Sequence, residues 1–307
     1  MIRKNVFRRN AIRFPARLIA WFMACLLLAG TATAEEEPVY FVQKAEANCL
    51  GSMMVTYDAP TLKYTIETFL MNGEKCYLTR VWTKDPAKQI RKVTGKWKKT
   101  LEFPKTMATQ LPEAVLLING SGYVSPQFPA IPDNYPGESK DYFYTPLGSL
   151  TVTDSEIFRN LEGVPYYGLI LNKDGLQMIT GEDNGKVLVM NPIQTWSFYT
   201  TCTMLRNNED LLPEEWVFAD RRAARTCIGR LDRNNYLLLS VRDDMKGGIS
   251  LRRAVTFFQD NFPEAEWVYN LDGGPSSALL CREQGRKKVR IIMGGGAKDA
   301  DCMAFTE

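Results

Sequence analysis

The segment Trp267–Leu280 constrains the fold more than any other part of the chain, because an apolar run leads directly into an acidic residue and two glycines. Its aromatic and branched residues are typical of a buried strand, and Gly273-Gly274-Pro275 then requires a sharp turn. Asp272 is expected at the end of the strand, where glycines leave room for a ligand near the backbone N–H groups. Ser276 and Ser277 follow as hydroxyl donors or as the N-cap of a helix. Such a turn suits an anion or a sugar hydroxyl.

The first 34 residues have the pattern of a secretory signal peptide. Six basic residues and no acidic residue precede an apolar run, Leu18–Leu28, and Ala32-Thr33-Ala34 follows it. The run is shorter than the roughly 20 residues that span a bilayer. We therefore expect a signal peptide at residues 1–34 and a mature chain that is periplasmic or secreted, with no stable membrane span. An uncleaved anchor is the alternative.

The mature chain carries no excess of positive charge. Removal of those six residues leaves 32 of the 38 basic residues, against 35 acidic residues. The net charge of +3 therefore belongs to the targeting segment, and no nucleic-acid partner is expected.

The counts of cysteine and histidine restrict the chemistry. Six cysteines follow residue 34, and an even number in an exported chain favours disulfides, although six cysteines allow 15 connectivities. The expected pairs are Cys49–Cys76, Cys202–Cys227 and Cys281–Cys302. The absence of histidine excludes Ser-His-Asp triads, Cys-His dyads and His-ligated metal sites. Acid–base chemistry must then use carboxylates, Tyr, Lys or water.

Strand patterns dominate the first two thirds of the chain. Residues 39–82 are strand-rich, with a hairpin turn expected at Met71-Asn72-Gly73-Glu74. Val115–Ile118 is expected to be a buried strand. Four short segments are expected to form an antiparallel meander: Leu150–Thr153, Gly168–Leu171, Gln177–Thr180 and Val187–Met190. The basic stretch Lys84–Lys105 is interpreted as a solvated loop or helix face rather than as a patch for an acidic polymer.

The last third predicts a hairpin and then a helix. Arg225–Leu231 and Tyr236–Val241 are expected to pair, and Ser250 is expected to cap a helix that ends near Pro263. We therefore expect one α+β domain over residues 35–307, mainly antiparallel or mixed β-sheet with a few helices, stabilised by disulfides. Its strand-rich N-terminal part is 39–82 and its motif-bearing part is 111–305.

Three separated motifs resemble those of the phosphodiester glycosidase family, which includes a lysosomal uncovering enzyme and bacterial members related to exopolysaccharides. The motifs are Ile118-Asn119-Gly120-Ser121-Gly122-Tyr123, Ala224-Arg225-Thr226-Cys227-Ile228-Gly229-Arg230 and Asn270-Leu271-Asp272-Gly273-Gly274-Pro275-Ser276-Ser277. The third is the most specific, and the resemblance spans about residues 76–305. Pro275 stands where a third glycine is common and Ser121-Gly122 replaces a plainer turn, which leaves the substrate open.

The resemblance implies that the three motifs converge on one pocket that hydrolyses the glycosidic bond of a sugar-1-phosphodiester. A phosphodiester leaving group needs little or no protonation, so the absence of histidine is no obstacle. Asp272 is expected to act as nucleophile or general base, and Arg225 to bind the phosphate bidentately. The expected substrate-binding residues are Asn119, Gly120, Thr226, Asn270, Gly273, Gly274, Ser276 and Ser277.

Each of these residues also has a structural alternative. Asp272 could cap its own turn, Arg225 could pair with a buried carboxylate, and Asn119 could stabilise its own turn. Ser276 and Ser277 could cap a helix.

No cofactor is predicted, and a divalent cation such as calcium is left open. Asp183-Asn184-Gly185, Asp243-Asp244 and Asp299–Asp301 lack the spacing of a known calcium loop and are interpreted as surface turns. The expected partner is a carbohydrate or glycan phosphodiester, and the oligomeric state is open. The alternative functions are a non-catalytic envelope protein of the same fold, which binds a glycan or glycolipid and assists polysaccharide biosynthesis or export, and an adhesion or assembly factor.

Overall fold

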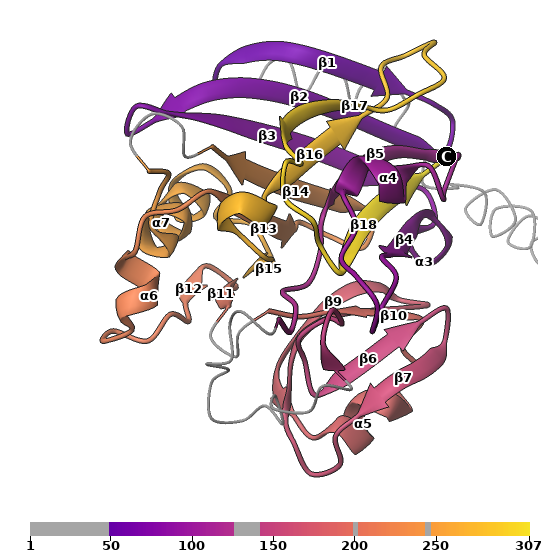
Figure 1. Ribbon diagram of the computed structural model, residues 1–307. Helices are drawn as coiled ribbons and strands as arrows, with labels where there is room; N and C mark the ends of the chain where they lie inside the picture. Colours follow the sequence, from indigo (N-terminus) through magenta and orange to yellow (C-terminus); the bar gives the residue numbers. More distant parts are fainter. Residues whose placement is uncertain (1–48, 126–141, 199–201, 243–246) are drawn as a thin grey trace, which may run out of the picture.

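The computed structural model describes residues 49–125, 142–198, 202–242 and 247–307. The expected signal peptide and Asp243-Asp244, interpreted as a surface turn, lie outside these ranges. Two large sheets dominate the architecture (Figure 1), and the strands within each sheet pair antiparallel. The predicted α+β class, mainly antiparallel sheet with a few helices, is confirmed.

The first sheet has eight strands in the order β1-β2-β3-β14-β13-β15-β11-β12. Their bounds are β1 Ser52–Asp58, β2 Leu62–Met71, β3 Glu74–Thr83, β11 Thr203–Arg206, β12 Glu209–Asp210, β13 Arg225–Arg230, β14 Asn235–Val241 and β15 Trp267–Asn270. The second sheet has five strands in the order β17-β16-β5-β18-β4. These are β4 Ile90–Thr94, β5 Ala114–Asn119, β16 Ala278–Cys281, β17 Arg290–Gly294 and β18 Asp301–Thr306.

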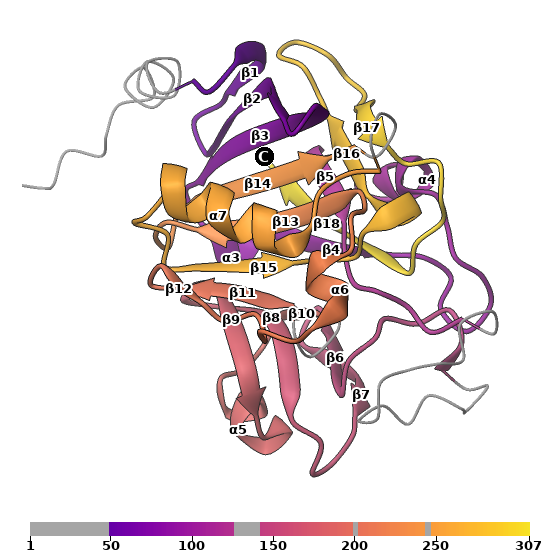
Figure 2. The same ribbon diagram turned by 90° about the vertical axis from the view of Figure 1, so that its left-hand side faces the viewer.

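Helices cover the outer faces of the two large sheets. The helix α7, Leu251–Asn261, packs its apolar face on the eight-stranded sheet, and Figure 2 shows it lying across that sheet. The short helix α4, Pro104–Ala108, packs on the five-stranded sheet. The inner faces of the two sheets share the main core. The molecule is therefore layered helix, sheet, sheet, helix.

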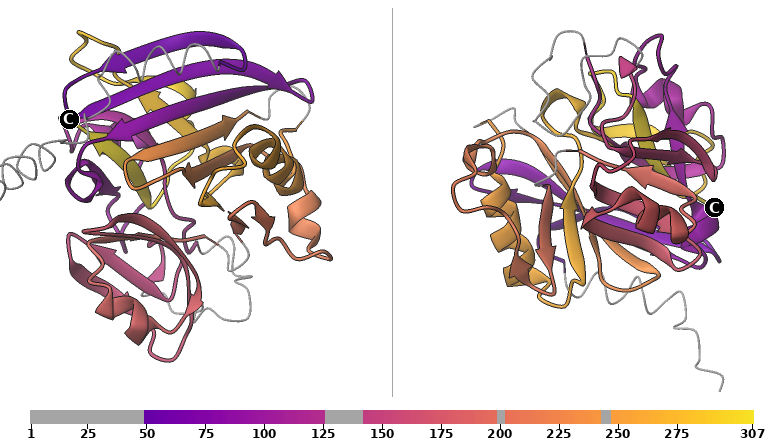
Figure 3. Two further views of the ribbon diagram at one scale, coloured as in Figure 1. Left: turned by 180° about the vertical axis from the view of Figure 1, so that it is seen from behind. Right: turned by 90° about the horizontal axis from the view of Figure 1, so that it is seen from below.

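A smaller β-structure packs at one end of these layers, below the large sheets in Figure 1 and visible from behind in Figure 3. It contains a three-stranded sheet, β10-β8-β9, and a two-stranded sheet, β6-β7. Their bounds are β6 Leu150–Thr153, β7 Glu156–Asn160, β8 Tyr166–Asn172, β9 Gly175–Glu182 and β10 Gln194–Trp196. The remaining helices are α3 Pro86–Gln89, α5 Asn184–Val189, α6 Val217–Asp220 and the 3₁₀ helix η2 Gly274–Ser276.

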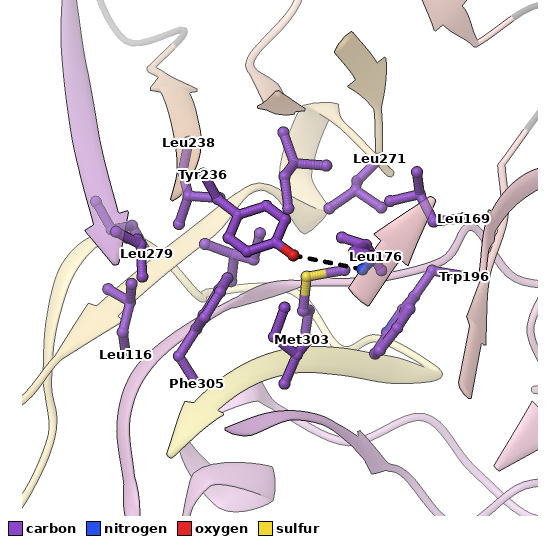
Figure 4. Close-up of a cluster of buried hydrophobic side chains, with 14 of the residues drawn as sticks. Leu116, Leu169, Leu176, Trp196, Tyr236, Leu238, Leu271, Leu279, Met303 and Phe305 are labelled. Carbon is purple, nitrogen blue, oxygen red and sulfur yellow. Dashed lines mark hydrogen bonds between the residues drawn. The ribbon is translucent and has the colours of Figure 1, made fainter. Parts of the chain in front are cut away.

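Side chains from all three larger sheets meet in the main core, as Figure 4 shows. The Tyr236 hydroxyl on β14 accepts a hydrogen bond from the Leu176 N–H on β9 at 3.3 Å. Leu271, which follows β15, is fully buried in this cluster. The start of the Asp-Gly-Gly turn is therefore anchored in the core.

Several local predictions are confirmed. The hairpin turn joins β2 to β3 with Met71 opposite Glu74, and Asn72 and Gly73 both have positive φ, as a two-residue hairpin turn requires. The β13–β14 hairpin is also present. The Ser250 hydroxyl accepts a hydrogen bond from the Arg253 N–H at 3.2 Å and so caps α7.

Two local predictions are wrong. Val187–Met190 is not a fourth strand of the meander, because α5 runs through Asn184–Val189. The Asp183 side chain caps that helix by accepting from the Gly185 N–H at 2.8 Å. Lys84–Lys105 is not a uniformly solvated stretch, because Lys92 in β4 is buried.

The predicted disulfides are not seen: no disulfide joins any two of the six cysteines in the described residues. Cys202 and Cys227 both lie opposite Asn270 of β15, from the strands on either side of it. Cys281 and Cys302 likewise lie on the two strands that flank β5. Two strand spacings amount to about 9–10 Å, which exceeds the Cα separation of a disulfide.

No helix within the described ranges is long and apolar enough to cross a membrane.

Candidate active site

The chain crosses between the two large sheets at the Asp-Gly-Gly turn. Leu271 N–H donates to the Thr226 carbonyl at 2.9 Å, and Asp272 N–H donates to the Gly120 carbonyl at 3.1 Å. Thr226 belongs to the eight-stranded sheet, whereas Gly120 follows β5 of the five-stranded sheet. The turn is therefore held by backbone bonds to both sheets.

Asn119 joins the three sequence motifs through its side-chain amide. Its Nδ2 donates to the Asp272 carbonyl at 2.7 Å, and its Oδ1 accepts from the Thr226 hydroxyl at 2.7 Å and from the Ala278 N–H at 3.0 Å. Asn119 and Thr226 are both fully buried. The structure thus brings residues 119, 226 and 272 together, and the side chains of Asn119 and Thr226 are used to hold the turn.

Asp272 lies just beneath the surface. It is 9% exposed, while Gly273 and Gly274 are half-buried and Pro275 is exposed. Burial raises the pKa of the Asp272 carboxyl to about 7, and the nearby charge of Asp301 raises it further, while hydrogen bonds from the Gly273 N–H and the Ser276 side chain oppose the rise. The carboxyl can therefore exchange a proton near neutral pH, which suits a base or a nucleophile.

The two glycine N–H groups of the turn already have partners. Gly273 N–H donates to Asp272 Oδ1 at 2.7 Å, and Gly274 N–H donates to the Ala224 carbonyl at 2.9 Å. Gly274 has φ +58°, and a Cβ on Gly273 would lie 2.9 Å from the Ala224 carbonyl oxygen. The glycines are thus required for the close approach of the turn to Ala224. Their contact with a phosphate stays a prediction.

The other expected substrate-binding residues differ in exposure and partners. Asn270 is fully buried, and its Nδ2 donates to the Leu271 carbonyl at 2.7 Å. A Cβ on Gly120 would lie 2.0 Å from Asp301 Oδ1, so the carboxylate occupies space that only a glycine leaves. Ser277 Oγ is buried without a hydrogen-bond partner among the described residues.

Arg225 lies behind the turn, and its positive charge is not neutralised by a carboxylate of the described residues. Its Nη2 donates to the Arg221 carbonyl at 2.5 Å and its Nε to the Ile249 carbonyl at 3.3 Å. The guanidinium carbon lies 5.2 Å from the centroid of the Phe218 ring. Burial lowers the pKa of Arg225, yet a guanidinium stays charged at neutral pH. The alternative of a pairing with a buried carboxylate is thus not seen within these ranges.

Four residues that the sequence did not assign complete the site: Tyr123, Lys92, Asp299 and Asp301. Interaction with the Ser276 side chain opposes the rise in the pKa of Asp272, Asp299 and Tyr123. Asp299 and Asp301 are buried, so their interpretation as surface turns is wrong. The signal available in the sequence was their position just before the apolar strand β18, which resembles the position of Asp272 after β15.

Asp301 is held by Ser121 and Lys92. Its Oδ1 accepts from the Ser121 N–H at 2.7 Å, its Oδ2 accepts from the Ser121 hydroxyl at 3.0 Å, and Lys92 Nζ lies 3.6 Å from Oδ2. Burial raises the pKa of Asp301, which Lys92 and Ser121 oppose, and burial lowers the pKa of Lys92. Lys92 Nζ also lies 5.4 Å from the centroid of the Trp196 ring.

No group of three or more acidic, cysteine or histidine side chains that could hold a metal ion occurs in the part of the chain that the structure describes.

Residues 112–300 match the family described as phosphodiester glycosidase. The fold is similar to the catalytic domain of zebrafish N-acetylglucosamine-1-phosphodiester alpha-N-acetylglucosaminidase, auto-inhibited by its pro-peptide, with TM-score 0.59, 16% identity, and coverage of 83% of this chain and 88% of that one. It is also similar to a hypothetical protein from Synechocystis, with TM-score 0.51, 11% identity, and coverage of 83% and 64%. No curated protein sequence matches the chain significantly.

Proposed function

The chain belongs to the phosphodiester glycosidase family, and from this membership and the geometry around Asp272 we propose that it hydrolyses the glycosidic bond of a sugar-1-phosphodiester. The observation that carries the proposal is the junction at Asn119. All three motifs meet there. The Asp272 carboxyl, which has a pKa of about 7, lies beneath the turn at this junction.

Asp272 acts at the anomeric carbon. In its ionised form it either removes a proton from the attacking water or attacks that carbon itself, and in the second case water then cleaves the bond between the sugar and Asp272 to release the sugar. The bond from the anomeric carbon to the phosphate oxygen breaks, and its electron pair leaves on the phosphate. Because that oxygen is a weak base, no acid is needed to protonate it.

Arg225 supplies the positive charge for the phosphate. Its Nη1 and Cδ are the atoms nearest to Gly273 apart from the Ala224 carbonyl, 3.9 Å from the position of a Cβ there. A guanidinium without a carboxylate partner among the described residues keeps its attraction for an anionic ligand. The bidentate contact remains part of the proposal.

The hydrogen-bonded residues serve to position Asp272. Asn119 and Thr226 fix the backbone of the turn, and the Ser276 side chain stabilises the ionised form of Asp272. Ser276 and Ser277 are both buried behind the exposed Pro275, so their contact with sugar hydroxyls stays a prediction.

We further propose that the protein is exported and acts on envelope or extracellular glycan material. The support is the signal-like sequence of residues 1–34. Expression in a Gram-negative host, followed by N-terminal sequencing of the periplasmic and extracellular protein, should find a chain that starts at Glu35. A chain that keeps Met1 and stays with the membrane would contradict this proposal.

The activity is tested with a panel of sugar-1-phosphodiesters. The panel includes an N-acetylglucosamine-1-phosphodiester, a UDP-sugar and a synthetic aryl phosphodiester, and the release of free sugar is measured. Release that is lost in Asp272→Asn supports the enzyme. Tight glycan binding without release from any substrate supports the glycan-binding alternative instead.

A further inference from the structure

Asp299 lies in a fixed and buried segment. Its N–H donates to the Glu102 carbonyl at 2.8 Å, and its carbonyl accepts from the Glu102 N–H at 3.1 Å. The residue is 1% exposed. Neither carboxyl oxygen makes a hydrogen bond of normal geometry to the described residues.

The groups that face Asp299 favour its neutral form. Asp272 and Asp301 are both carboxyls, whose negative charges raise the pKa of Asp299. The charge of Asp299 in turn raises the pKa of the Tyr123 hydroxyl and of the Cys302 thiol. The ammonium group in this region belongs to Lys92, which is paired with Asp301. A buried carboxylate without a partner is strongly unfavourable, so such a group keeps its proton.

Ser276 connects this carboxyl to Asp272. Its side chain is 5% exposed and opposes the rise in the pKa of both carboxyls, although neither Asp299 oxygen has a partner of normal hydrogen-bond geometry among the described residues. Two carboxyls that share neighbours in this way titrate as a pair, losing one proton well before the other. Asp272, nearer to the surface, ionises first, because burial and the Asp272 charge raise the pKa of Asp299 well above its usual range.

We propose that Asp299 is a positioning residue that keeps its proton while Asp272 is ionised, so that the pair presents a single negative charge to the anomeric carbon. This role rests on the proposed function. Asp299 gives up no proton in the reaction, since the phosphate leaves with the electron pair of the broken bond. Ionisation of Asp299 would place a second negative charge beside an anionic substrate and oppose its binding.

The test compares the pH dependence of kcat/KM in the wild type and in Asp299→Asn, which has nearly the same shape and no proton to lose. The wild type should lose activity at alkaline pH as Asp299 ionises. The variant should keep its activity there, while its neutral-pH kcat/KM stays within about tenfold of wild type. Asp260→Asn, at an exposed position of α7, should keep the wild-type profile. An unchanged alkaline limb in Asp299→Asn, or a folded but inactive variant, overturns the proposal.

A second measurement does not depend on activity. Carbon-13 NMR of wild-type protein labelled at aspartate carboxyls should show one buried carboxyl still protonated at about pH 8, beyond the ordinary range of Asp. The infrared difference between wild type and Asp299→Asn should show a carboxylic-acid band. If every aspartate is ionised at that pH, the proposal fails even if sugar is released. If the carboxyl is protonated and no phosphodiester is cleaved, it is the proposed function that fails.

Discussion

Asp301 and Asp299 lie two residues apart at the start of the last strand, and both are buried, yet their surroundings are opposite. Asp301 receives two hydrogen bonds from Ser121 and faces the ammonium of Lys92. Asp299 has no hydrogen bond of normal geometry within the described residues and faces Asp272.

This difference separates a buried carboxylate that its neighbours stabilise from a buried carboxyl that has no such partners among the described residues. A buried polar group without partners costs stability. Such a group is tolerated where it contributes to activity, since active sites commonly sacrifice stability. The two clusters, Lys92–Ser121–Asp301 and Asp272–Ser276–Asp299, should therefore respond differently to the same kind of substitution.

The largest effect is expected for Asp272→Asn. Sugar release should fall about 10⁴-fold, which corresponds to about 5.5 kcal/mol in activation free energy, because the variant has no negative charge to place at the anomeric carbon. The variant should remain folded by circular dichroism. Near-wild-type release would show that Asp272 is not required for catalysis, and the two clusters would then not differ in their effect on activity.

The next effect concerns stability. Lys92→Met leaves Asp301 buried without its counter-charge and should lower the free energy of unfolding by about 3–5 kcal/mol, measured by urea denaturation. Lys88→Met is the matched control: Lys88 pairs with Asp85 at 2.9 Å, but its side chain is 84% exposed, so the loss should stay below about 1 kcal/mol. Equal losses in both variants would contradict a structural role for the Lys92–Asp301 pair.

A smaller effect should appear in the pH dependence of stability. The pKa of Asp272 in the folded protein is about 7, above the ordinary value of 3.8 for an aspartate, so the folded protein keeps a proton that the unfolded chain releases. The stabilisation is complete below about pH 4 and is lost as pH rises to about 7. Between about pH 5 and 7.5 the loss should be about 2–3 kcal/mol.

Asp272→Asn isolates this contribution, because the other titrating groups are common to both proteins. The unfolding free energy of the variant, relative to wild type, should rise with pH over that range. A difference in unfolding free energy that does not depend on pH would mean that folding does not raise the pKa of the Asp272 carboxyl.

The smallest effect is expected for Thr226→Val, which has nearly the same shape. It removes the hydroxyl that donates to Asn119 Oδ1, while the Ala278 N–H still donates to that oxygen. The cost should be about 1 kcal/mol in unfolding free energy, with sugar release reduced by less than about tenfold. A loss of several kcal/mol, by thermal or urea unfolding, would mean that the junction has no such redundancy.

The sequence predicted the elements whose signals are local. The hairpin at Asn72-Gly73 depends on two residues that accept positive φ, and the helix α7 depends on a serine cap and an apolar spacing of three and four residues. Val187–Met190 failed because an apolar run of four residues fits either a strand or a helix. The Asp183 side chain caps the first turn of a helix at this position, and the segment is helical.

The site was predicted only in part, for a related reason. The resemblance of the motifs around Asn119, Thr226 and Asp272 to those of the family implied that they converge. Lys92 and Asp301, by contrast, are paired across neighbouring strands β4 and β18. That burial and pairing depend on contacts between residues about two hundred positions apart, which no local pattern encodes.

The position of β18 has a consequence for how the protein matures. This strand, Asp301–Thr306, lies inside the five-stranded sheet, between β5 and β4, and all of its residues are buried. A nascent chain that lacks it leaves β5 and β4 as unpaired edges and leaves Gly120 without the Asp301 carbonyl that its N–H reaches at 3.1 Å. Contacts of such long sequence separation form slowly, so we expect the contact between Gly120 and β18 to form late in folding, and shortened translation products should be cleared by proteases rather than accumulate.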